Sequence, residues 1–467
     1  MQYVSTRGNA PAIGFLEAAL GGLAPDGGLY VPQAWPQIPM AATQLGGLPY
    51  AHAAAGVLRA FAGDALTQAE AEMLCVEAYA SFAAPDVTPL RQIGDNSYIL
   101  ELFHGPTLAF KDVALQLIGK LFDWALTRSG ERRTVIAATS GDTGGAAAGA
   151  LAGLKAVDLF VMFPAGRISE VQRRFMTTTG EANIHAIEIE GSFDDAQAIM
   201  KQMLADQALV QQAQLSAVNS VNWLRIAAQS VYYFTTAARL GKAPIYAVPT
   251  GNFGDAFAGY VARALGSPTA HFVIATNSND ILARTLDSGR YAQGKSVATS
   301  SPAMDITLAS NFERLLFDAS GRDSKFVADA YARLSREGGY DIPAATLNTI
   351  RASFSSGSAN DAEVAAKIQQ MHKDSGFLVD PHTAVGLVVA DKLSQKLESI
   401  APGAPIVTLS TAHAAKFPET VSEVTGVNPA LPAHCADLFS RKENIVSLPA
   451  DANAIKAYLL GAARAAR

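Results

Sequence analysis

From about residue 86 onward, short runs of β-branched and other apolar residues alternate with Ala-rich runs whose apolar positions recur at helical spacing. The strand-like runs, each followed by a helix-like run, are "TVIAAT" (134–139), "VDLFVMF" (157–163), "IHAIEIE" (184–190), "PIYAVP" (244–249) and "PIVTLS" (405–410). Such alternation is typical of parallel sheets that are covered by helices on both faces. The pattern therefore predicts an α/β fold for this region.

Residues 1–85 carry a different pattern, in which helical runs such as "AHAAAGVLRAFAG" are interrupted by a Gly- and Pro-rich stretch at 21–39. The density of Gly and Pro predicts a loop with turns. Because this stretch also carries apolar residues to bury, we expect a mainly helical N-terminal cap domain rather than a linker. The Ser- and Gly-rich stretch 352–363 predicts an exposed loop.

The composition is that of a globular protein large enough for two or three domains. Of the 467 residues, 49% are hydrophobic and 17% are charged, and the formal net charge is −6 with no strongly basic block, which argues against nucleic acid as a partner. We expect neither a signal peptide nor a membrane helix, because no run has the required pattern. Cys75, Cys435 and the scattered histidines indicate no disulfide framework and no metal site. We therefore expect a cytoplasmic protein.

Lys111 lies at an unusual place, near the predicted start of an amphipathic helix. Pro106 and Thr107 suit a helix start and cap, which would put Lys111 in about the second turn. The apolar face of this helix would be formed by Phe110, Val113, Ala114, Leu117, Ile118 and Leu121. Burial and the positive end of the helix dipole both favour a neutral amine, the form that imine chemistry requires. The alternative is a lysine that extends out of a helix start into water, and position alone favours that alternative.

Two strand-to-helix loops could each bind an anion. The loop formed by Thr250, Gly251, Asn252, Phe253, Gly254 and Asp255 offers backbone N–H groups at a predicted helix start. It lacks the Walker and GxGxxG patterns, so a small phosphate monoester fits it better than a nucleotide. The second loop, "AATSGDTGGAAAGA" (137–150), carries hydroxyls that suit a carboxylate. Each loop is also compatible with a plain turn, capped by Asp255 in the first and by Asp142 or Thr143 in the second.

A lysine that can form an imine, a phosphate loop and a carboxylate loop are needed together in one known chemistry. Pyridoxal 5′-phosphate requires a lysine for its aldehyde, an anion site for its phosphate and a place for the carboxylate of an amino acid.

Seven stretches, which run in family order through nearly the whole chain, resemble the threonine synthases. They are "GLAPDGGLYVP", "HGPTLAFKDVALQ", "ATSGDTGGAAAGA", "NSVNWLRIAAQ", "PTGNFGDAFAGY", "DPHTAVG" and "STAHAAKFPE". The resemblance is to the longer-chain branch of this pyridoxal-phosphate family. It implies the tryptophan-synthase-β-like fold, also called fold type II. It further implies an N-terminal domain at 1–85, a catalytic region of two interleaved lobes at 86–430 and a C-terminal segment at 431–467 that packs on it.

The resemblance also implies roles for single residues. Lys111 matches the lysine that binds the cofactor covalently and later moves protons, and Thr411 matches the hydroxyl that contacts the pyridine nitrogen. The cofactor-phosphate loop matches Gly251, Asn252, Phe253, Gly254 and Asp255. Groups that bind the substrate carboxylate match Thr139, Ser140 and Thr143. Groups that bind the substrate phosphate match Asn219, Ser220 and Arg225.

Asp142 departs from the usual pattern of the fold, because many relatives place an Asn against the cofactor's 3′-oxygen at this position. A carboxylate there would repel a phenolate, so we expect Asp142 either to hold a proton or to turn away. The family motifs also contain His104, His382 and His413, for which we expect structural roles.

The implied reaction converts O-phospho-L-homoserine and water to L-threonine and phosphate in a monomer or homodimer. Two alternatives stay open at this point. One is a serine or threonine dehydratase, or a β-replacement enzyme like cysteine synthase, which needs no arginine for a second phosphate. The other is a homologue that binds the cofactor without catalysis and acts as a regulatory or interaction protein.

Overall fold

The computed structural model describes residues 1–217 and 220–466. One sheet consists of β4 (Leu90–Gly94), β5 (Ser97–Glu101), β10 (Ile245–Pro249), β11 (His271–Thr276), β14 (Phe354–Ser358) and β15 (Ile406–Ser410). A second sheet consists of β6 (Arg133–Ala138), β7 (Val157–Pro164), β8 (Ile184–Glu190), β9 (Leu215–Ala217) and β16 (Val446–Pro449). In the described part of the chain their orders are β14-β11-β10-β15-β5-β4 and β16-β8-β7-β6-β9.

Neighbouring strands run parallel in both large sheets, with the exception of the edge strand β4, which is antiparallel to β5. The predicted α/β fold with parallel sheets is confirmed. All five strands predicted from the sequence form, and β7 is buried along its whole length, as expected for an inner parallel strand.

Two stretches predicted as loops contain strands instead. Within 352–363, β14 pairs with β11, and its Ser and Gly residues are accommodated because β14 lies at the edge of its sheet. Within 21–39, β3 (Tyr30–Pro32) joins β1 (Gln2–Ser5) and β2 (Ile13–Gly14) in a small antiparallel sheet. In both cases pairing with a distant strand outweighs the local signal of a loop.

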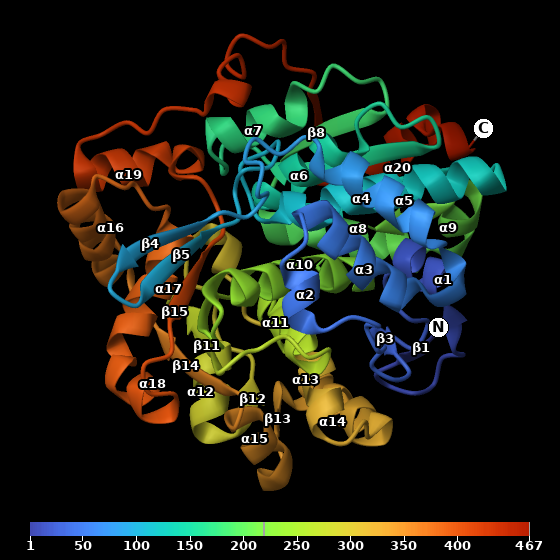
Figure 1. Cartoon of the computed structure of the whole chain (residues 1–467). Helices are drawn as coiled ribbons and strands as arrows, with labels where there is room; N and C mark the ends of the chain where they lie inside the picture. The colour runs from blue at the N-terminus through green and yellow to red at the C-terminus, as the bar shows by residue number, and fades with distance from the viewer. Residues whose placement is uncertain (218–219, 467) are drawn as a thin grey trace.

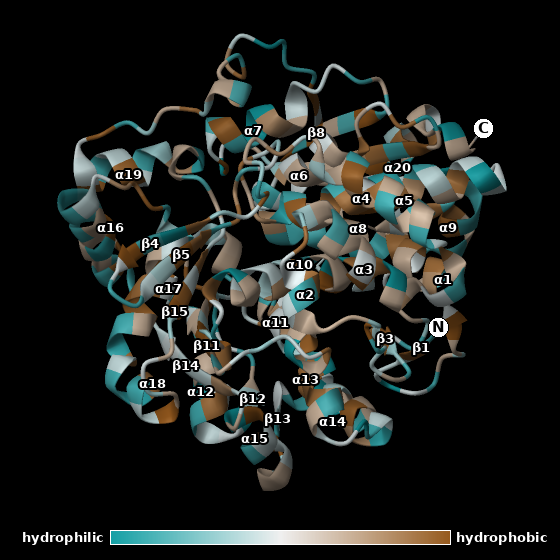
Figure 2. Ribbon diagram, viewed as in Figure 1, coloured by the Kyte–Doolittle hydropathy of each residue, from teal (hydrophilic) through white to brown (hydrophobic). Residues whose placement is uncertain are grey.

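Helices cover both sheets, and α10 (Trp223–Leu240) crosses the centre of the molecule between them (Figure 1). The helices associated with the second sheet are α5 (Lys111–Ser129), α6 (Asp142–Leu151), α7 (Glu170–Thr177), α8 (Phe193–Ala205), α9 (Gln207–Ala213) and α20 (Ala452–Ala462). Those on the side of the first sheet are α11 (Gly254–Ala264), α12 (Ile281–Ser288), α13 (Phe312–Ala319), α14 (Ser324–Glu337), α15 (Ala344–Arg351), α16 (Asp361–Ser375), α17 (Pro381–Lys392), α18 (Ser394–Ile400) and α19 (Pro418–Thr425). Hydrophilic residues gather on outer helices such as α16 and α18 (Figure 2).

The N-terminal region is mainly helical, as predicted, and consists of the small sheet with α1 (Phe15–Gly21), α2 (Ala42–Gly46), α3 (Tyr50–Ala62) and α4 (Gln68–Tyr79). It is tied to the rest of the chain by Arg314 of α13, whose guanidinium donates to the carbonyl oxygen of Tyr30 at 3.0 and 3.1 Å and to that of Val221 at 2.6 Å. A second link is the ion pair between Arg7 and Glu313 at 2.9 Å. The buried core of this region is continuous with that of the residues that follow it.

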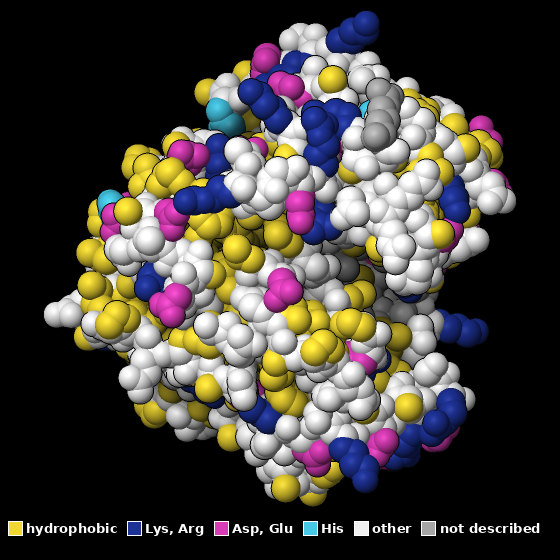
Figure 3. Space-filling model, turned by 90° about the vertical axis from the view of Figure 1, so that its right-hand side faces the viewer, with side chains coloured by type: hydrophobic (Ala, Val, Ile, Leu, Met, Phe, Trp, Pro, Cys, Tyr) yellow, Lys and Arg dark blue, Asp and Glu magenta, His cyan; other side chains and the backbone are white. Residues whose placement is uncertain are grey.

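The surface seen in Figure 3 carries Lys and Arg side chains interspersed with Asp and Glu side chains. Among the described residues, no helix is both long enough and apolar enough to cross a membrane. Within the same residues, His, Cys, Asp and Glu side chains form no group of three or more that could hold a metal ion.

Candidate active site

The loops that follow four parallel strands meet at one place between the sheets. Asp142 follows β6, the loop 250–253 follows β10, Thr411 follows β15, and Lys111 begins the helix after β5. In open α/β folds, ligands bind where the carboxyl ends of parallel strands come together. The chain topology therefore brings the predicted lysine and the predicted anion loops to one edge.

Lys111 is the first residue of α5, and Phe110 is its N-cap. The sequence predicted Lys111 in the second turn, but it lies in the first turn. The predicted cap by Thr107 is also wrong, because its hydroxyl and its N–H donate to the Asp112 carboxylate at 2.6 and 2.8 Å. The inner face of α5 is as predicted, since Val113, Ala114, Leu117, Ile118 and Leu121 are all buried.

The Lys111 side chain is buried and does not extend into water, because the residue is only 8% exposed. Burial lowers the pKa of its amine, Asp142 opposes this effect, and Lys416 and Arg225 add to the lowering. A buried amine with a lowered pKa can lose its proton near neutral pH, as imine formation requires.

Asp142 neither turns away nor holds a proton. Its Oδ2 accepts from Lys111 Nζ at 3.2 Å, and its Oδ1 lies 2.8 Å from Lys416 Nζ and accepts from Gln172 Nε2 at 3.0 Å. Burial alone would raise the pKa of Asp142, but the two lysines hold it well below its ordinary value. The carboxylate is therefore charged and is neutralised by the protein itself.

The loop 251–254, predicted to be an anion cup, presents backbone N–H groups at the start of α11. In the described part of the chain, the backbone N–H groups of Gly251, Asn252, Phe253 and Gly254 have no acceptor. Phe253 has the left-handed φ of 64° and is the N-cap of α11, so the N–H groups lie at a helix start. A Cβ on Gly251 would lie 3.0 Å from the carbonyl oxygen of Ala303, so a side chain there would require the neighbouring backbone to shift.

Asp255 binds two tyrosine hydroxyls and does not serve as the N-cap of α11, which is Phe253. It is the second residue of α11, and its Oδ1 accepts from the hydroxyls of Tyr232 and Tyr233. Its Oδ2 is buried without a partner among the described residues. Burial raises the pKa of Asp255 to about 6, against the hydrogen bonds from the two tyrosines.

Arg225 places a buried guanidinium near the cup. It lies in the first turn of α10 and is only 4% exposed. No side chain or carbonyl of the described residues forms a hydrogen bond or ion pair with its guanidinium. Burial lowers its pKa to about 10, which Tyr232 and Asp255 oppose. A guanidinium stays charged at such a pKa, and a buried charge without a partner is costly.

Ser220 lies beside the cup and is linked to it through Ser310. Its Oγ is 3.2 Å from Ser310 Oγ, and Ser310 in turn donates to Asn252 Oδ1 at 3.2 Å. Asn311 donates its amide to the carbonyl oxygens of both Ser220 and Asn252. Asn219 lies outside the described residues.

The second predicted loop, between β6 and α6, is shaped by Thr139. Its hydroxyl oxygen accepts from the N–H groups of Gly141 and Gly144 at 2.9 and 3.0 Å. The N-cap of α6 is Gly141, and Thr139, rather than a side chain of Asp142 or Thr143, accepts from the first-turn N–H of Gly144. Ser140 and Thr143 are half-buried, and the structure gives their hydroxyls no partner among the described residues.

Thr411 directly follows β15 and is 6% exposed. Its carbonyl oxygen accepts from the N–H of Phe110 at 2.8 Å, which brings it beside Lys111. The structure gives its hydroxyl no partner within the described residues, so the hydroxyl is available to a ligand.

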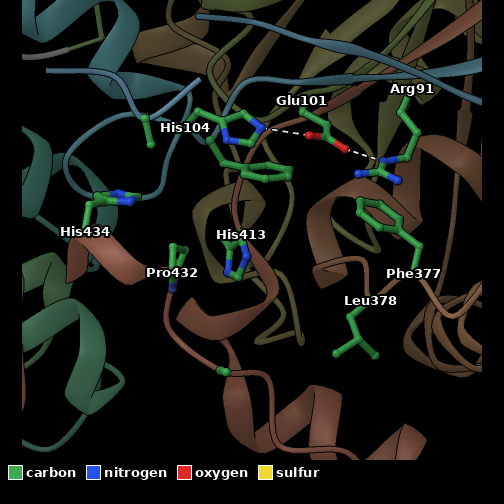
Figure 4. Close-up of a pocket in the computed structure, with 11 residues that line it drawn as sticks. Arg91, Glu101, His104, Phe377, Leu378, His413, Pro432 and His434 are labelled. Carbon is green, nitrogen blue, oxygen red and sulfur yellow. Dashed lines mark hydrogen bonds and ion pairs between the residues drawn. The ribbon is translucent and has the colours of Figure 1, made fainter. Parts of the chain in front are cut away.

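The three motif histidines have structural contacts. His382 contacts Asp380 at 2.9 Å and accepts from the N–H of Ala303. His104 lies 2.7 Å from Glu101, and Glu101 also binds Arg91. These three residues line a pocket of about 300 Å³ beside the site (Figure 4). His413 also lines the pocket and accepts a hydrogen bond from the N–H of Ala415. Burial lowers the pKa of His413 to about 4.

Sequence reasoning missed Lys416, Gln172, Ser310 and Asn311. Lys416 lies within the stretch "STAHAAKFPE", so a signal was present, but nothing local links it to Asp142. The other three come from stretches without any motif, and only the fold brings them to the site.

Comparison with known proteins agrees with this geometry. Protein-family models described as "Threonine synthase N terminus", "Pyridoxal-phosphate dependent enzyme" and "Threonine synthase, C-terminal" match residues 2–79, 83–412 and 383–459. The threonine synthase of Pseudomonas aeruginosa is 46% identical over 98% of this chain and 98% of its own length. That of Saccharomyces cerevisiae is 40% identical over 90% of this chain and 88% of its own length.

Solved structures show the same relationship. The structure of the pyridoxal-phosphate-bound threonine synthase from Brucella melitensis matches with a TM-score of 0.95 and 47% identity, over 99% of this chain and 100% of that one. The yeast enzyme matches with a TM-score of 0.92 and 36% identity, over 99% and 98%. A tomato threonine deaminase, 14% identical with a TM-score of 0.52, shares the fold alone. The chain thus belongs to the threonine synthase family of pyridoxal-phosphate-dependent enzymes.

Proposed function

We propose that this enzyme converts O-phospho-L-homoserine and water to L-threonine and phosphate. The observation that carries the substrate assignment is Arg225, a buried guanidinium without an anionic partner in the described part of the chain. Arg225 offers a second anion-binding group beside the anion cup that the N–H groups of 251–254 form. Two anion sites suit a reaction in which both the cofactor and the substrate carry a phosphate, because a guanidinium can bind two phosphate oxygens at once.

The site fits pyridoxal 5′-phosphate. Free backbone N–H groups at the start of α11 would hold its phosphate, Lys111 would bond its aldehyde, and the Thr411 hydroxyl would contact its pyridine nitrogen. When bound, this cofactor supplies an electron-accepting ring that makes protons next to the amino group acidic.

Each role of the chain's own residues follows from its chemistry. Ser220, Arg225 and Asn219 bind the substrate phosphate and orient it for departure from Cγ. Ser140 and Thr143 donate hydroxyl hydrogen bonds to the substrate carboxylate, while Thr139 holds their loop in shape.

Lys111 moves protons between Cα, Cβ and Cγ of the substrate. This task needs an amine that gains and loses a proton near neutral pH, and burial of Lys111 lowers its pKa in that direction. Phosphate leaves Cγ, which becomes a methyl group, and the oxygen of water ends on Cβ.

The alternatives differ in what they need from Arg225. A dehydratase or a β-replacement enzyme acts on a substrate without a phosphate and leaves this guanidinium unpaired. We therefore compare O-phospho-L-homoserine with L-serine, L-threonine and O-acetyl-L-serine as substrates. Turnover of the phosphate ester alone supports the proposal, whereas preferred turnover of any other substrate contradicts it. Cofactor binding without any turnover supports the non-catalytic alternative.

Arg225 could instead bind the phosphate of the cofactor, and substitution separates the two roles. Under the proposal, Arg225→Gln raises KM for O-phospho-L-homoserine at least about tenfold, the loss expected for one charge-assisted contact of about 1.4 kcal/mol or more. The affinity for pyridoxal 5′-phosphate stays close to that of the wild type. Weakened cofactor binding with unchanged KM contradicts the assignment. Arg284→Gln is the control, because Arg284 lies on the surface in an ion pair with Asp280.

We also propose that the enzyme acts in the cytoplasm as a monomer or homodimer. Support comes from Cys75 and Cys435, which are free and buried, as is usual in a reducing compartment. Light scattering after gel filtration measures the oligomeric state, and a tetramer or larger assembly would contradict the proposal.

A further inference from the structure

Lys416 is a second buried amine at the site, and the proposed reaction gives it no role. It is the last residue of η3 (Ala414–Lys416), the short helix that follows β15 and Thr411, and it is fully buried. Its Nζ lies 2.8 Å from Asp142 Oδ1 and donates to the carbonyl oxygen of Thr107 at 2.9 Å. Lysines are almost never buried completely unless they are paired, so its partner Asp142 matters to it.

Lys111 and Lys416 share the single carboxylate of Asp142. Lys416 has the shorter contact, 2.8 Å against 3.2 Å, and it has a second oxygen acceptor in Thr107. Lys111 has only Asp142 as an oxygen acceptor within the described residues, together with the Phe110 ring 4.6 Å from its Nζ. Of the two amines, Lys111 is therefore the one that can give up its proton at the lower cost.

Other charged groups, both cationic and anionic, lie around the two lysines. The charged or titratable groups that interact with this pair come from α5, α10, α11, α17 and η4 (Ala433–Cys435), and they are Asp112, Arg225, Asp255, His382 and Cys435. Lys111 and Lys416 both contact Asp142, so their amines repel each other strongly when both are charged in this buried site. Loss of the Lys111 proton removes this repulsion.

We propose that Lys416 is a positioning residue that takes the Asp142 carboxylate as its own counter-ion, which leaves the Lys111 amine free of its proton and able to bond the cofactor. In that step the amine attacks the aldehyde carbon and forms a carbon–nitrogen double bond. The aldehyde oxygen leaves as water together with the two amine hydrogens. The inference rests on Lys111 as the cofactor lysine.

The test measures how fast the full-length, cofactor-free chain captures pyridoxal 5′-phosphate as a function of pH, followed by absorbance. Lys416→Met leaves Asp142 with Lys111 as its only lysine partner, so the pH midpoint of capture rises by about one unit or more. Capture at pH 7 is then at least about tenfold slower. Lys416→Arg keeps the charge and stays close to wild type. The control Lys392→Met removes a surface lysine paired with Glu363 and changes nothing.

A second substitution separates the charge effect from a merely structural one. In Lys416→Met with Asp142→Asn, the carboxylate that retains the Lys111 proton is gone, so the midpoint returns to the wild-type value or falls below it. If Lys416 only shapes the loop through Thr107, the double variant stays as impaired as Lys416→Met, and this overturns the inference. An unchanged midpoint in folded Lys416→Met overturns it as well. If Lys416→Met does not fold, the single variant Asp142→Asn decides the question. The inference requires its pH midpoint of cofactor capture to fall below that of the wild type, and an unchanged or higher midpoint overturns it.

Borohydride reduction of the loaded wild-type enzyme followed by peptide mapping separates this inference from the assignment on which it rests. Label on Lys111 together with an unchanged midpoint in Lys416→Met overturns the role of Lys416 alone. Label on Lys416 or another lysine overturns the assigned site and the inference together.

Discussion

Lys111 is surrounded by charged groups from other elements, and these groups decide whether its amine carries a proton. Asp142 comes from α6, Arg225 from α10 and Lys416 from η3. The sequence singled out Lys111 beside the apolar face of α5, but its position alone favoured a lysine that extends into water, and its assignment rested on the two anion loops and the family resemblance. It could not predict Lys416 or the charge of Asp142, because the distance between two distant side chains is set only by the packed fold.

Lys111→Ala removes both the amine that bonds the cofactor and the group that moves protons. We expect turnover to fall by at least about a thousandfold, within the range for a lost proton-transfer group, and the cofactor to be lost on gel filtration. Lys120→Ala is the matched control on the same helix, because Lys120 lies on the surface 3.8 Å from Glu77. Turnover retained in Lys111→Ala would contradict the assignment.

Asp255 makes the cofactor-free protein less stable as the pH rises. Its pKa is raised from 3.8 to about 6 by burial, so the folded state binds the proton more tightly than the unfolded state. The free energy of unfolding therefore falls between those two pH values, by about 3 kcal/mol at most.

Asp255→Asn removes this titration and keeps an oxygen that can accept from Tyr232 and Tyr233. Urea unfolding at pH 4 and pH 7 measures the effect. We expect the variant to gain on the wild type as the pH rises. An equal gap at both pH values would show that Asp255 does not titrate in this window.

At the scale of elements, the site depends on how closely α5 and α6 pack, because Lys111 and Asp142 are the first residues of these helices. Gly119 allows this approach, since a Cβ there would come within 2.3 Å of the carbonyl oxygen of Ala150. Hydrophobic periodicity predicted the five central strands, whose apolar runs are long. It missed β14, whose Ser and Gly residues form a strand only through pairing with β11.

Gly119→Ala forces α5 and α6 apart, because the added methyl group meets backbone rather than a flexible side chain. We expect the free energy of unfolding to fall by about 1–3 kcal/mol and the cofactor to bind more weakly. Gly21→Ala is the control, since a Cβ at Gly21 meets nothing within 4 Å. If both variants behave alike in thermal unfolding and cofactor titration, the close approach does not govern the site.

At the scale of the whole molecule, the N-terminal region supports the site through α13. Arg314 binds the carbonyl oxygens of Tyr30 and Val221, and the neighbouring Asn311 holds the loops of Ser220 and Asn252. Composition predicted that this region buries apolar residues as a cap. It could not reveal that the contact runs through a buried arginine beside the residues that we propose to bind phosphate.

Arg314→Met removes the buried guanidinium that donates to the carbonyl oxygens of Tyr30 and Val221. We expect a loss of about 3 kcal/mol or more in the free energy of unfolding, together with a higher KM for O-phospho-L-homoserine. Arg333→Met on the surface of α14 is the control, because its pair with Glu337 is exposed. A stable Arg314→Met with unchanged KM would show that the two regions are independent.

The central claim is that phosphate leaves Cγ and water adds at Cβ. It is tested most directly by the reaction of the cofactor-loaded enzyme with O-phospho-L-homoserine in H₂¹⁸O, followed by mass spectrometry of both products. The account predicts equal amounts of threonine with one ¹⁸O in its hydroxyl group and phosphate released without label from the solvent. Homoserine with labelled phosphate would show simple ester hydrolysis, and no release from loaded enzyme would show a different substrate; either result contradicts the account.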